Sequence, residues 1–480
     1  MEPDPSQLLA RLRSHGQEHL LQFWDELTPD DRAVLAAQIE SIDLEHVSAL
    51  HKKATAKSAE KATGSLAELA ARAEPPPAVR LADRTSKTVE GVTSQLMADR
   101  ARKAGEQALA AGKIGVVLVA GGQGSRLGFD HPKGLFPIGP VSGATLFQIL
   151  FEKILATQRK YGADVPLYLM TSPATHGETL TALDKVDRYG LSADNVRVFC
   201  QGTMPAVDAK TGRLLLEEKG RLFLSPDGHG GMLQALVRSG ALLDMRRRGL
   251  TQLFYMQVDN PLVVVCDPSF IGYHLGSGSE VSTQVVAKHD PLERVGNVVS
   301  IDGRVQIIEY SDLPEDLARQ TLPDGELKLW AGNIAVHVFD LAFLERASGE
   351  SHCLPFHAAR KAAPHVCETG EVVTPKEPTA IKFERFIFDL MPAARHSLVY
   401  EVNQQETFAP VKNGSGAKSD TPETVQAQMM ALHRGWLTAA GAKLDEGARV
   451  EISPLFALDA AAVAERIPAG LRVTQDRYFK

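Results

Sequence analysis

The sequence predicts an α/β protein with a Rossmann-like sheet that is mixed but mostly parallel and is flanked by helices. A helical region precedes this sheet and a small C-terminal lobe follows it. Two observations carry the prediction: four apolar runs of strand length lie between residues 114 and 258, and segments with helical periodicity separate them. Such sheets bind ligands outside the carboxyl ends of their strands, so the residues after each run are the first site candidates.

The first part of the chain, residues 1–100, is expected to be a helical region with a connector. Ser6 can cap one helix, and Thr28 followed by Pro29 supplies the cap and first-turn proline of another. Between residues 52 and 90 the composition shifts to Ala, Lys and Ser and then to three consecutive prolines. This composition predicts a weak helix followed by an extended, solvated connector.

The central part, residues 101–402, is expected to be the catalytic domain. Its four predicted strands cover residues 114–120, 165–171, 196–200 and 252–258, and its predicted helices include residues 145–160 and 232–248. Asp302 and Gly303 stand between two alternating runs and predict a β-hairpin. The segment 354–366 is expected to form a short helix after Pro355, and its His and Cys residues match no standard zinc spacing.

The last part, residues 403–480, is expected to be a small separate lobe. It contains one helical pattern, residues 423–440, and two short strand-like pieces, residues 449–453 and 471–476.

Charge and composition exclude several classes of function. The formal net charge is −7, which argues against a nucleic-acid or membrane-surface partner. The first residues carry no signal-peptide pattern and no apolar stretch reaches membrane-spanning length, so a cytoplasmic location is expected. Four widely spaced cysteines indicate reduced thiols. No oligomeric state is predicted.

The loop after the first predicted strand carries the clearest chemistry. It reads GGQGSRLG from Gly121 and is followed by Pro-Lys-Gly with Lys133 at its centre. Glycines allow backbone N–H groups to approach phosphate closely, while Arg126 offers a planar fork and Lys133 a mobile point charge. The alternative is a tight strand-to-helix turn with incidental cations.

Two common phosphate motifs do not fit these residues. A dinucleotide fingerprint that starts at Gly122 would need glycine at position 127, where Leu127 stands. A Walker loop would need Lys followed by Ser or Thr, but Gly134 follows Lys133. NAD-dependent and P-loop chemistry are therefore not expected.

The loop LVAGGQGSRLGFDHPKG resembles the signature of the UDP-sugar pyrophosphorylases, and within them the UDP-N-acetylhexosamine pyrophosphorylase branch. Further matching segments follow in the family's order between about residues 80 and 440: LYLMTS, QGTMPA, LSPDGHGG, VDNPLV, VGNVV, IIEYSD, AGNIAVHVF, LPFHAARK, IKFERFIFDL and FAPVKNGSGAKSDTPETV. The resemblance implies a nucleotide-diphospho-sugar transferase fold. It also implies a uridylyltransferase that makes UDP-sugar and pyrophosphate from UTP and a sugar-1-phosphate.

The resemblance also implies a nucleotide site, because in relatives the base and ribose lie near the glycine loop, the QG-x-x-PA segment and the PDGxGG segment. The implicated residues are Gly121, Gly122, Gly124, Gln201, Gly202, His229 and Gly231. A glutamine amide can donate and accept toward uracil, although Gln201 alone would more often be a surface residue. His229 stands where relatives usually carry Asn, so protonation near neutral pH is expected to make nucleotide affinity pH-sensitive.

For the metal, the resemblance points to Asp259, directly after the fourth predicted strand, as the acid that positions Mg²⁺ or Mn²⁺ beside the phosphates. A turn-capping role is the alternative. For the sugar it points to five residues: Gly296, Glu309, Asn333, Phe386 and Phe388. Alternating aromatics in a strand usually belong to the core, so one of the two phenylalanines is expected there.

The expected chemistry is in-line attack by the sugar phosphate on the α-phosphorus of UTP. Four cations are the catalytic candidates: Arg126, Lys133, Lys382 and Lys412. They would offset the negative charges that the two substrates bring together, so no protein nucleophile or general base is required. N-acetylglucosamine-1-phosphate is the expected sugar substrate. A UDP-glucose or broad-specificity pyrophosphorylase is the first alternative, and a non-catalytic nucleotide-sugar sensor is the second.

Overall fold

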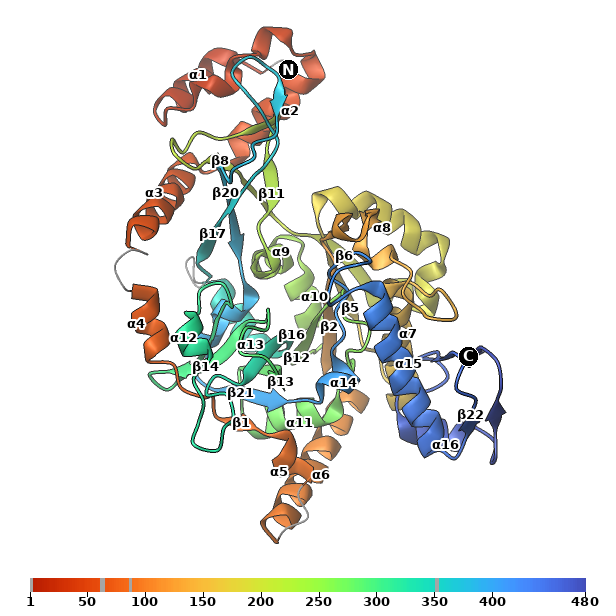
Figure 1. The fold of residues 1–480 in the computed structure, drawn as a ribbon. Coiled ribbons are helices and arrows are strands. Elements are labelled where there is room, and N and C mark those ends of the chain that lie inside the picture. Colours follow the sequence, from red (N-terminus) through yellow and green to blue (C-terminus); the bar gives the residue numbers. More distant parts are fainter. Residues whose placement is uncertain (1–2, 61–64, 86–88, 350–353) are drawn as a thin grey trace. The chain divides into compact units, whose positions relative to one another are not determined.

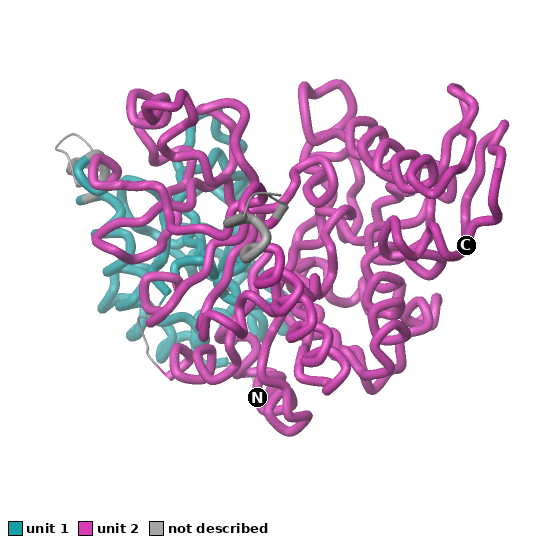
Figure 2. Tube along the Cα trace, turned by 90° about the horizontal axis from the view of Figure 1, so that it is seen from below, with its two compact units in different colours: residues 1–69, 201–232, 354–389 teal, residues 70–200, 233–353, 390–480 magenta. Residues whose placement is uncertain are grey.

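The computed structural model describes residues 3–60, 65–85, 89–349 and 354–480. The chain divides into two compact units, both built from separated stretches of sequence (Figure 2). Unit 1 comprises residues 1–69, 201–232 and 354–389, and unit 2 comprises residues 70–200, 233–353 and 390–480. The division of the chain at residues 100 and 402 stays a prediction.

Unit 2 contains the large sheet, whose strands are labelled in Figure 1. Its strand order is β1 (Ala78–Val79), β21 (Ser397–Glu401), β13 (Val281–Ala287), β16 (Ala331–Asp340), β12 (Gln252–Gln257), β2 (Ile114–Val119), β5 (Leu167–Thr171) and β6 (Val196–Cys200). Strands β12, β2, β5 and β6 run parallel, and β16 lies antiparallel to both of its neighbours. The predicted mixed, mostly parallel sheet is confirmed, and its four parallel neighbours are the four apolar runs.

The apolar character of these strands follows from burial on both faces of the sheet. All five residues of β5 are buried, and so are five of the six residues in β2 and in β12. Both sides need apolar side chains, so the sequence shows continuous runs instead of alternation. The core around these strands includes Phe147 and Phe151.

Two of the local predictions in unit 2 are confirmed with their physical cause. Strands β14 (Asn297–Ile301) and β15 (Arg304–Ile308) form an antiparallel hairpin. Asp302 and Gly303 both have positive φ, 51° and 77°, as a two-residue turn of this hand requires. Helix α7 (Leu146–Tyr161) begins where Thr145 accepts the N–H of Gln148, in agreement with the predicted helix.

The predicted helix 232–248 is interrupted. It forms two helices, α9 (Met232–Arg238) and α10 (Ala241–Arg247). Gly240 between them has φ of 70°, a left-handed conformation that ends one helix before the next begins.

The predicted extended connector is wrong for much of its length. The described parts of residues 52–90 contain the end of α3 (Leu44–Glu60), then α4 (Ser65–Ala71) and α5 (Leu81–Thr85), while residues 61–64 and 86–88 lie outside the described part. β1 adds an edge strand to the large sheet. Arg80 holds it there, since its Nε lies 2.7 Å from Glu401 Oε2 and its guanidinium stacks on Trp330. This pairing is non-local, so composition did not reveal it.

Unit 1 combines the N-terminal helices with a small antiparallel sheet. The helices include α1 (Pro5–Arg13) and α2 (Pro29–Ser41), as predicted. Thr28 caps α2 as expected, but the expected cap at Ser6 is wrong, because Asp4 caps α1 and its side chain accepts the N–H of Ser6. The sheet has the order β17 (Phe356–Lys361), β20 (Ala380–Arg385) and β8 (Val207–Asp208). The predicted helix in residues 354–366 is wrong, because Phe356–Lys361 pairs as a strand along the whole of β20. Pairing with a distant strand overrides the helical preference of its Ala-rich sequence.

The C-terminal part of unit 2 has its own apolar cluster. Helix α15 (Pro422–Ala439) confirms the predicted helix and begins at the capping residue Thr421. Its buried Leu437 packs in one cluster with Val450 and Val463. The short strands pair in two parallel sheets, β22 (Lys443–Leu444) with β24 (Arg472–Val473) and β23 (Val450–Ile452) with β25 (Arg477–Phe479).

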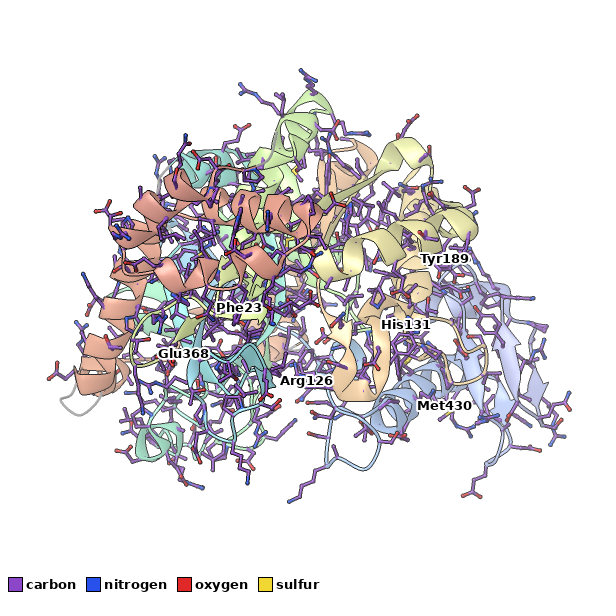
Figure 3. All side chains as sticks on the ribbon, turned by 90° about the horizontal axis from the view of Figure 1, so that it is seen from above. Phe23, Arg126, His131, Tyr189, Glu368 and Met430 are labelled. Atoms are coloured by element: carbon purple, nitrogen blue, oxygen red, sulfur yellow. The ribbon has the colours of Figure 1, made fainter. Side chains whose placement is uncertain are left out.

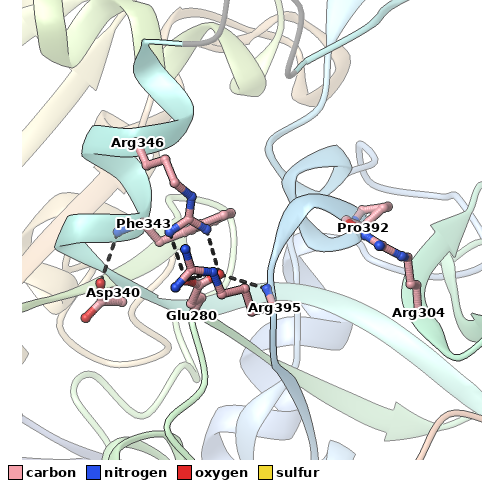
Figure 4. A network of polar contacts seen from close by, with 7 residues as sticks. All are labelled: Glu280, Arg304, Asp340, Phe343, Arg346, Pro392 and Arg395. Carbon is pink, nitrogen blue, oxygen red and sulfur yellow. Dashed lines mark hydrogen bonds and ion pairs between the residues drawn. The ribbon is translucent and has the colours of Figure 1, made fainter.

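Hydrogen bonds to the Glu280 carboxylate connect the beginning of β13 to neighbouring segments (Figure 4). Glu280 accepts two bonds from Arg346 of α13 (Leu341–Ser348), at 2.9 and 2.7 Å, and a third from the backbone N–H of Arg395 at 2.8 Å. These hydrogen bonds lower the pKa of Glu280. The arrangement ties a helix and the segment before β21 to the same edge of the sheet.

Among the described helices, none is long and apolar enough to cross a membrane.

Candidate active site

The glycine-rich loop leaves β2 and folds back as a small hairpin. β3 (Gln123–Gly124) pairs with β4 (Phe129–Pro132). A Cβ at Gly124 would lie 2.7 Å from the carbonyl oxygen of Phe129, so this glycine permits the two segments to touch. The N–H of Lys133 donates to the carbonyl of Gly122 at 3.0 Å, which closes the loop.

The other glycines of the loop face solvent. Gly122 is exposed, and an added Cβ there would meet nothing within 4 Å. The carbonyl of Gly121 accepts a hydrogen bond from Ser172 Oγ at 2.7 Å, which leaves its N–H for another partner. Arg126 lies exposed on η3 (Ser125–Leu127), on the same loop (Figure 3). The loop therefore has space for a ligand beside a guanidinium.

Lys133 and Asp259 meet at the carboxyl ends of two neighbouring strands. Lys133 Nζ lies 3.7 Å from Asp259 Oδ2, and the two side chains are 14% and 15% exposed. Burial lowers the pKa of Lys133, Asp259 opposes this change, and the cations Arg126 and Lys412 lower the pKa further. Arg126 and Lys412 are therefore both close enough to Lys133 to repel its positive charge.

The segment that carries Lys412 is held against this pair by backbone bonds. The N–H of Val411 donates to the carbonyl of Asp259 at 2.8 Å, and the N–H of Lys412 donates to the carbonyl of Asp420 at 2.8 Å. A Cβ on Gly414 would lie 3.0 Å from the carbonyl oxygen of Arg126, so the segment also passes close to the glycine-rich loop.

Asp420 is a site residue that the sequence reasoning missed. Its pKa is raised by burial, lowered by Lys412 and raised again by Asp259, so its carboxyl lies within the same group of charges. It also has φ of 57°, an uncommon left-handed conformation for a residue other than glycine. In the sequence it simply precedes the helix cap Thr421, and no local pattern distinguished it.

The chemistry of this cluster fits a hard divalent cation that is shared with phosphates. Two carboxylates, Asp259 and Asp420, stand beside the cationic loop. Mg²⁺ typically takes one or two protein carboxylates and completes its shell with water and substrate phosphate. In the described part of the chain no group of three or more His, Cys, Asp or Glu side chains could form an all-protein metal cage.

Three of the predicted sugar residues lie together on the part of the sheet formed by β14, β15 and β16. Gly296 precedes β14, Glu309 follows β15 and Asn333 lies on β16. A Cβ on Gly296 would lie 3.1 Å from Glu309 Oε1 and 3.7 Å from Asn333 Cβ. A glycine at this position therefore leaves the carboxylate and the amide accessible to a small hydroxyl-rich group.

The position of Asn333 depends on an irregularity in β16. The register between β13 and β16 shifts between Thr283 and Val285. Ala335 has φ of 55°, and its N–H donates to Asn333 Oδ1 at 3.1 Å. Bulges of this kind redirect side chains beside functional sites. The bond orients the Asn333 amide so that its NH₂ group is the donor left for a ligand.

In unit 1, His229 belongs to a stack of rings. His229 lies on η7 (His229–Gly231), and its ring stacks on Phe386 with centroids 5.3 Å apart. His357 stacks on Phe386 as well, at 4.5 Å, and its Nε2 lies 2.7 Å from Asp389 Oδ2. His357 and Asp389 were missed as neighbours of the site because they belong to separate elements, β17 and the segment after β20, that come together only in the folded unit.

Burial, with a smaller contribution from His357, lowers the pKa of His229 to about 4. The expected protonation of His229 near neutral pH is therefore wrong. Its Nδ1 accepts the N–H of Ile387 at 3.2 Å, so the neutral ring carries its proton on Nε2. A neutral Nε2–H is a donor suited to a ribose or phosphate oxygen.

The two phenylalanines have different environments. Strand β20 ends at Arg385, so they do not alternate along a strand as expected, and Phe388 belongs to η8 (Ile387–Ala393). Phe388 is buried in the core, whereas Phe386 keeps part of its surface exposed. Phe386 is therefore the better candidate for a ligand contact.

The PDGxGG segment is shaped by a buried ion pair. Arg385 lies 2.6 Å from Asp227 Oδ2. A Cβ on Gly231 would stand 1.9 Å from Asp227 Oδ1, and one on Gly228 would stand 2.4 Å from the carbonyl of Arg385. The fold of unit 1 therefore requires glycine at both positions. This packing requirement accounts for the two glycines without any role in ligand binding.

The remaining predicted residues lie apart from the cation cluster in sequence and belong to unit 1. Lys382 lies on β20 with its Nζ 4.6 Å from the centre of the Phe223 ring, and burial lowers its pKa. Gln201 is buried, and the carbonyl of Gly202 accepts the N–H of Asp227. Unit 2 thus brings together four of the predicted residues, Arg126, Lys133, Asp259 and Lys412. Lys382 is not one of them and lies beside Phe223 within unit 1.

Comparison with known proteins adds independent findings. The model of the UTP-glucose-1-phosphate uridylyltransferase family matches residues 78–458. The UDP-N-acetylhexosamine pyrophosphorylase-like protein 1 of Mus musculus is 37% identical over 441 residues, covering 90% of this chain and 85% of that protein. UDP-N-acetylglucosamine diphosphorylase 2 of Arabidopsis thaliana is 36% identical over 475 residues, covering 93% and 89%. The crystal structure of the UDP-N-acetylglucosamine pyrophosphorylase from Trypanosoma brucei superposes with a TM-score of 0.80 at 26% identity, covering 99% of both chains.

Proposed function

The chain belongs to the family of UTP-glucose-1-phosphate uridylyltransferases, and from this premise we propose that it makes UDP-N-acetylglucosamine and pyrophosphate from UTP and N-acetylglucosamine-1-phosphate. Membership of this family establishes that the chain is a nucleotidyltransferase. The relatives with names that refer to N-acetylated hexosamines cover nearly the whole chain and support the choice of sugar.

One structural observation supports this proposal most strongly. Arg126, Lys133 and Lys412 gather around Asp259 at the carboxyl ends of β2 and β12. Two polyanionic substrates must approach each other in this reaction, so fixed cations at their meeting point lower the barrier by electrostatic stabilisation. A loop with open space at Gly122 gives the polyphosphate access to these cations.

The reaction requires no covalent intermediate on the protein. An oxygen of the sugar phosphate forms a bond to the α-phosphorus of UTP, while the bond from that phosphorus to the bridging oxygen of the β-phosphate breaks and pyrophosphate leaves. The attacking phosphate is already ionised at neutral pH, so no proton needs to be removed. The protein's part is to align the two phosphates and offset their charge.

We assign Asp259 and Asp420 as the protein ligands of a divalent cation, Mg²⁺ or Mn²⁺. Such an ion, when bound, supplies positive charge to the phosphates. Lys133 lies 3.7 Å from Asp259, so this lysine keeps the carboxylate in place and contacts the same phosphates. We assign Lys382 of unit 1 as a further phosphate-binding cation.

Sugar and nucleotide are assigned to separate groups of residues. The acetamido sugar is placed beside Gly296, Glu309 and Asn333, where a carboxylate and an amide suit hydroxyl groups. Within unit 2 we assign the glycine loop to the nucleotide. Within unit 1 we assign the buried amide of Gln201 and the Nε2–H of His229 as nucleotide-binding groups.

A UDP-glucose pyrophosphorylase is the second candidate, because the matching family model is named for glucose-1-phosphate. The two functions differ by one acetamido group, and pockets discriminate such groups by only a few kcal/mol. A non-catalytic sensor would be expected to lack the metal acid or a phosphate cation, whereas Asp259, Lys133 and Lys412 are all present.

The test is a pyrophosphate-release assay with UTP and a panel of N-acetylglucosamine-1-phosphate, N-acetylgalactosamine-1-phosphate and glucose-1-phosphate. The proposal expects the highest kcat/KM with N-acetylglucosamine-1-phosphate and dependence on Mg²⁺. A preference for glucose-1-phosphate would support the second candidate. Absence of pyrophosphate release with all three sugars would contradict both.

A further inference from the structure

A second cavity lies within unit 2, away from the cation cluster. It encloses about 420 Å³ between helix α7, the segment 261–269 and the C-terminal elements around α15 and β23. Small-molecule sites commonly have volumes of about 300–1,000 Å³. Its walls are mainly apolar and include Ile149, Leu262, Val265, Met429, Leu432 and Trp436. None of the residues assigned to catalysis lines it.

Three cations line the cavity, Arg102, Lys153 and Lys160, and Lys153 is the one that is buried against backbone carbonyls. Lys153 of α7 donates from Nζ to the carbonyls of Pro261 at 2.6 Å and Val263 at 2.8 Å. Burial lowers its pKa to about 7. An ammonium has three N–H groups, and two carbonyls occupy two of them. Within the described chain, no carboxylate forms an ion pair with Lys153, so its charge lacks a counter-ion.

The acidic groups of the cavity wall are held by other donors. The Glu451 carboxylate is 3% exposed and accepts bonds from the N–H groups of Val141 and Ser142, at 2.8 and 2.6 Å. Asp267 accepts the N–H of Ser269 at 2.9 Å, at the start of α11 (Pro268–Gly276). Two further acids line the cavity: Glu406 accepts a hydrogen bond from Asn403 Nδ2, and Asp459 pairs with Lys160. Among the described residues, none of these four acids forms an ion pair with Lys153. A buried, unneutralised cation is costly, and an anion that enters the cavity offsets this cost.

We propose that this cavity binds a small apolar monocarboxylic acid. The carboxylate accepts the third N–H of Lys153, and the hydrocarbon or aromatic body packs against the apolar wall. Charge and shape argue together for this class of ligand, because one buried cation stands among side chains such as Leu262, Met429 and Trp436.

The cavity is also connected to the cation cluster through the chain. The two carbonyls that hold Lys153 belong to Pro261 and Val263, in the segment directly after Asp259. A ligand on Lys153 therefore contacts the segment that positions the proposed metal acid. This site goes beyond the proposed function and does not depend on it.

The test measures binding of naphthalene-2-carboxylate and of its neutral analogue naphthalene-2-carboxamide to the full chain by calorimetry at pH 6. The proposal expects the carboxylate to bind at least about tenfold more tightly than the carboxamide, as a charge-assisted hydrogen bond provides. Lys153→Met, which keeps length but removes charge, should abolish this preference. Lys160→Met, a matched lysine at the rim that pairs with Asp459, should retain it.

Equal affinity of the wild-type chain for both compounds, no binding of the carboxylate, or an undiminished preference in Lys153→Met would overturn the proposal. If Lys153→Met does not fold, Leu458→Trp replaces it, since this residue lines the cavity and the larger ring fills it. That variant should weaken carboxylate binding at least about tenfold, and unchanged binding would count against the site. The readout is binding alone, so failure of the proposed catalytic function leaves this result interpretable.

Discussion

Lys133 Nζ lies 3.7 Å from Asp259 Oδ2, although the two residues come from different loops of the sheet. The contact follows from strand register, because β2 and β12 are parallel neighbours in which Val119 pairs with Gln257. The loops that follow these two strands therefore begin side by side. This relationship brings the proposed phosphate-binding cation and the proposed metal-binding acid to one place.

Lys133→Ala is expected to lower kcat of pyrophosphate release about 10²-fold, the usual loss for one stabilising donor at a reacting phosphate. Arg126→Ala should behave similarly. The matched control is Lys185→Ala, an exposed lysine in the last turn of α8 (Pro173–Lys185), which should leave the rate unchanged. Near-normal turnover in both loop variants would refute the assignment of this loop.

Asp420→Asn is expected to raise the Mg²⁺ concentration needed for half-maximal activity several-fold, because one proposed carboxylate ligand loses its charge. Asparagine tolerates the left-handed backbone at this position, so the fold should be retained. Asp316→Asn, an exposed acid on α12 (Glu315–Ala318), is the control. An unchanged Mg²⁺ titration would remove Asp420 from the metal site.

Substitutions at Gly231 and Gly122 should distinguish a glycine that packing requires from a glycine that leaves room for UTP. Gly231→Ala is expected to lower the free energy of unfolding by about 1–3 kcal/mol or more, because its Cβ would stand 1.9 Å from Asp227 Oδ1. Gly122→Ala meets nothing within 4 Å and should fold normally, but its methyl group should raise KM for UTP. Urea denaturation and steady-state kinetics measure the two effects. Equal stability losses in both variants would contradict this distinction.

Glu280→Gln is expected to lower the free energy of unfolding by about 1–3 kcal/mol, because a 15%-exposed carboxylate loses its charge beside Arg346. The control is Glu315→Gln, where the exposed pair with Arg319 should contribute no more than about 0.5 kcal/mol. Urea denaturation at pH 7 compares the two. Similar losses in both variants would show that the Glu280 contacts in Figure 4 do not stabilise the sheet edge.

Buried histidines should make the protein less stable in mild acid. Burial lowers the pKa of His274 to about 4, whereas an unfolded histidine titrates near 6.5. Below about pH 6.5 the unfolded chain therefore binds a proton that the native ring does not, so stability falls as pH decreases from about 6.5 to about 4.

The contribution of His274 should reach up to about 1.4 kcal/mol per pH unit in this range. His274→Gln removes the titrating group, so the free energy of unfolding should decline less steeply in this variant between pH 7 and pH 5. Parallel pH dependences for the variant and the wild type would show that His274 does not titrate in this way.

Several elements were predictable from the sequence because their causes are local. The apolar runs of β2, β5 and β12 reflect burial on both faces, and the turn at Asp302 and Gly303 requires positive φ. Thr28 followed by Pro29 identified the start of α2, because the Thr28 side chain accepts the N–H of Asp31. Strand β17 was predicted as a helix because its Ala-rich composition favours one, and only pairing with β20 shows otherwise.

The candidate site was only partly predictable. The glycine-rich loop and Asp259 stand directly after strands of the parallel sheet, where such a sheet collects its ligands, and Lys133 follows at the end of the same loop. Asp420 and the ring stack of His229, Phe386 and His357 carried no local pattern, because each depends on contacts between distant segments. The pKa of His229 was misjudged for the same reason, since burial is set by surroundings and not by residue type.

By itself, the sequence determined the class of fold, the position of the glycine-rich loop and the family of uridylyltransferases, because glycine placement, strand-length apolar runs and ordered motifs are local properties. The tertiary structure decided which charges meet, which glycines are needed for packing, and where a buried lysine stands in an apolar cavity. These outcomes depend on strand register and on the burial of groups far apart in the chain. Such contacts form only when the whole sheet and its flanking helices have assembled.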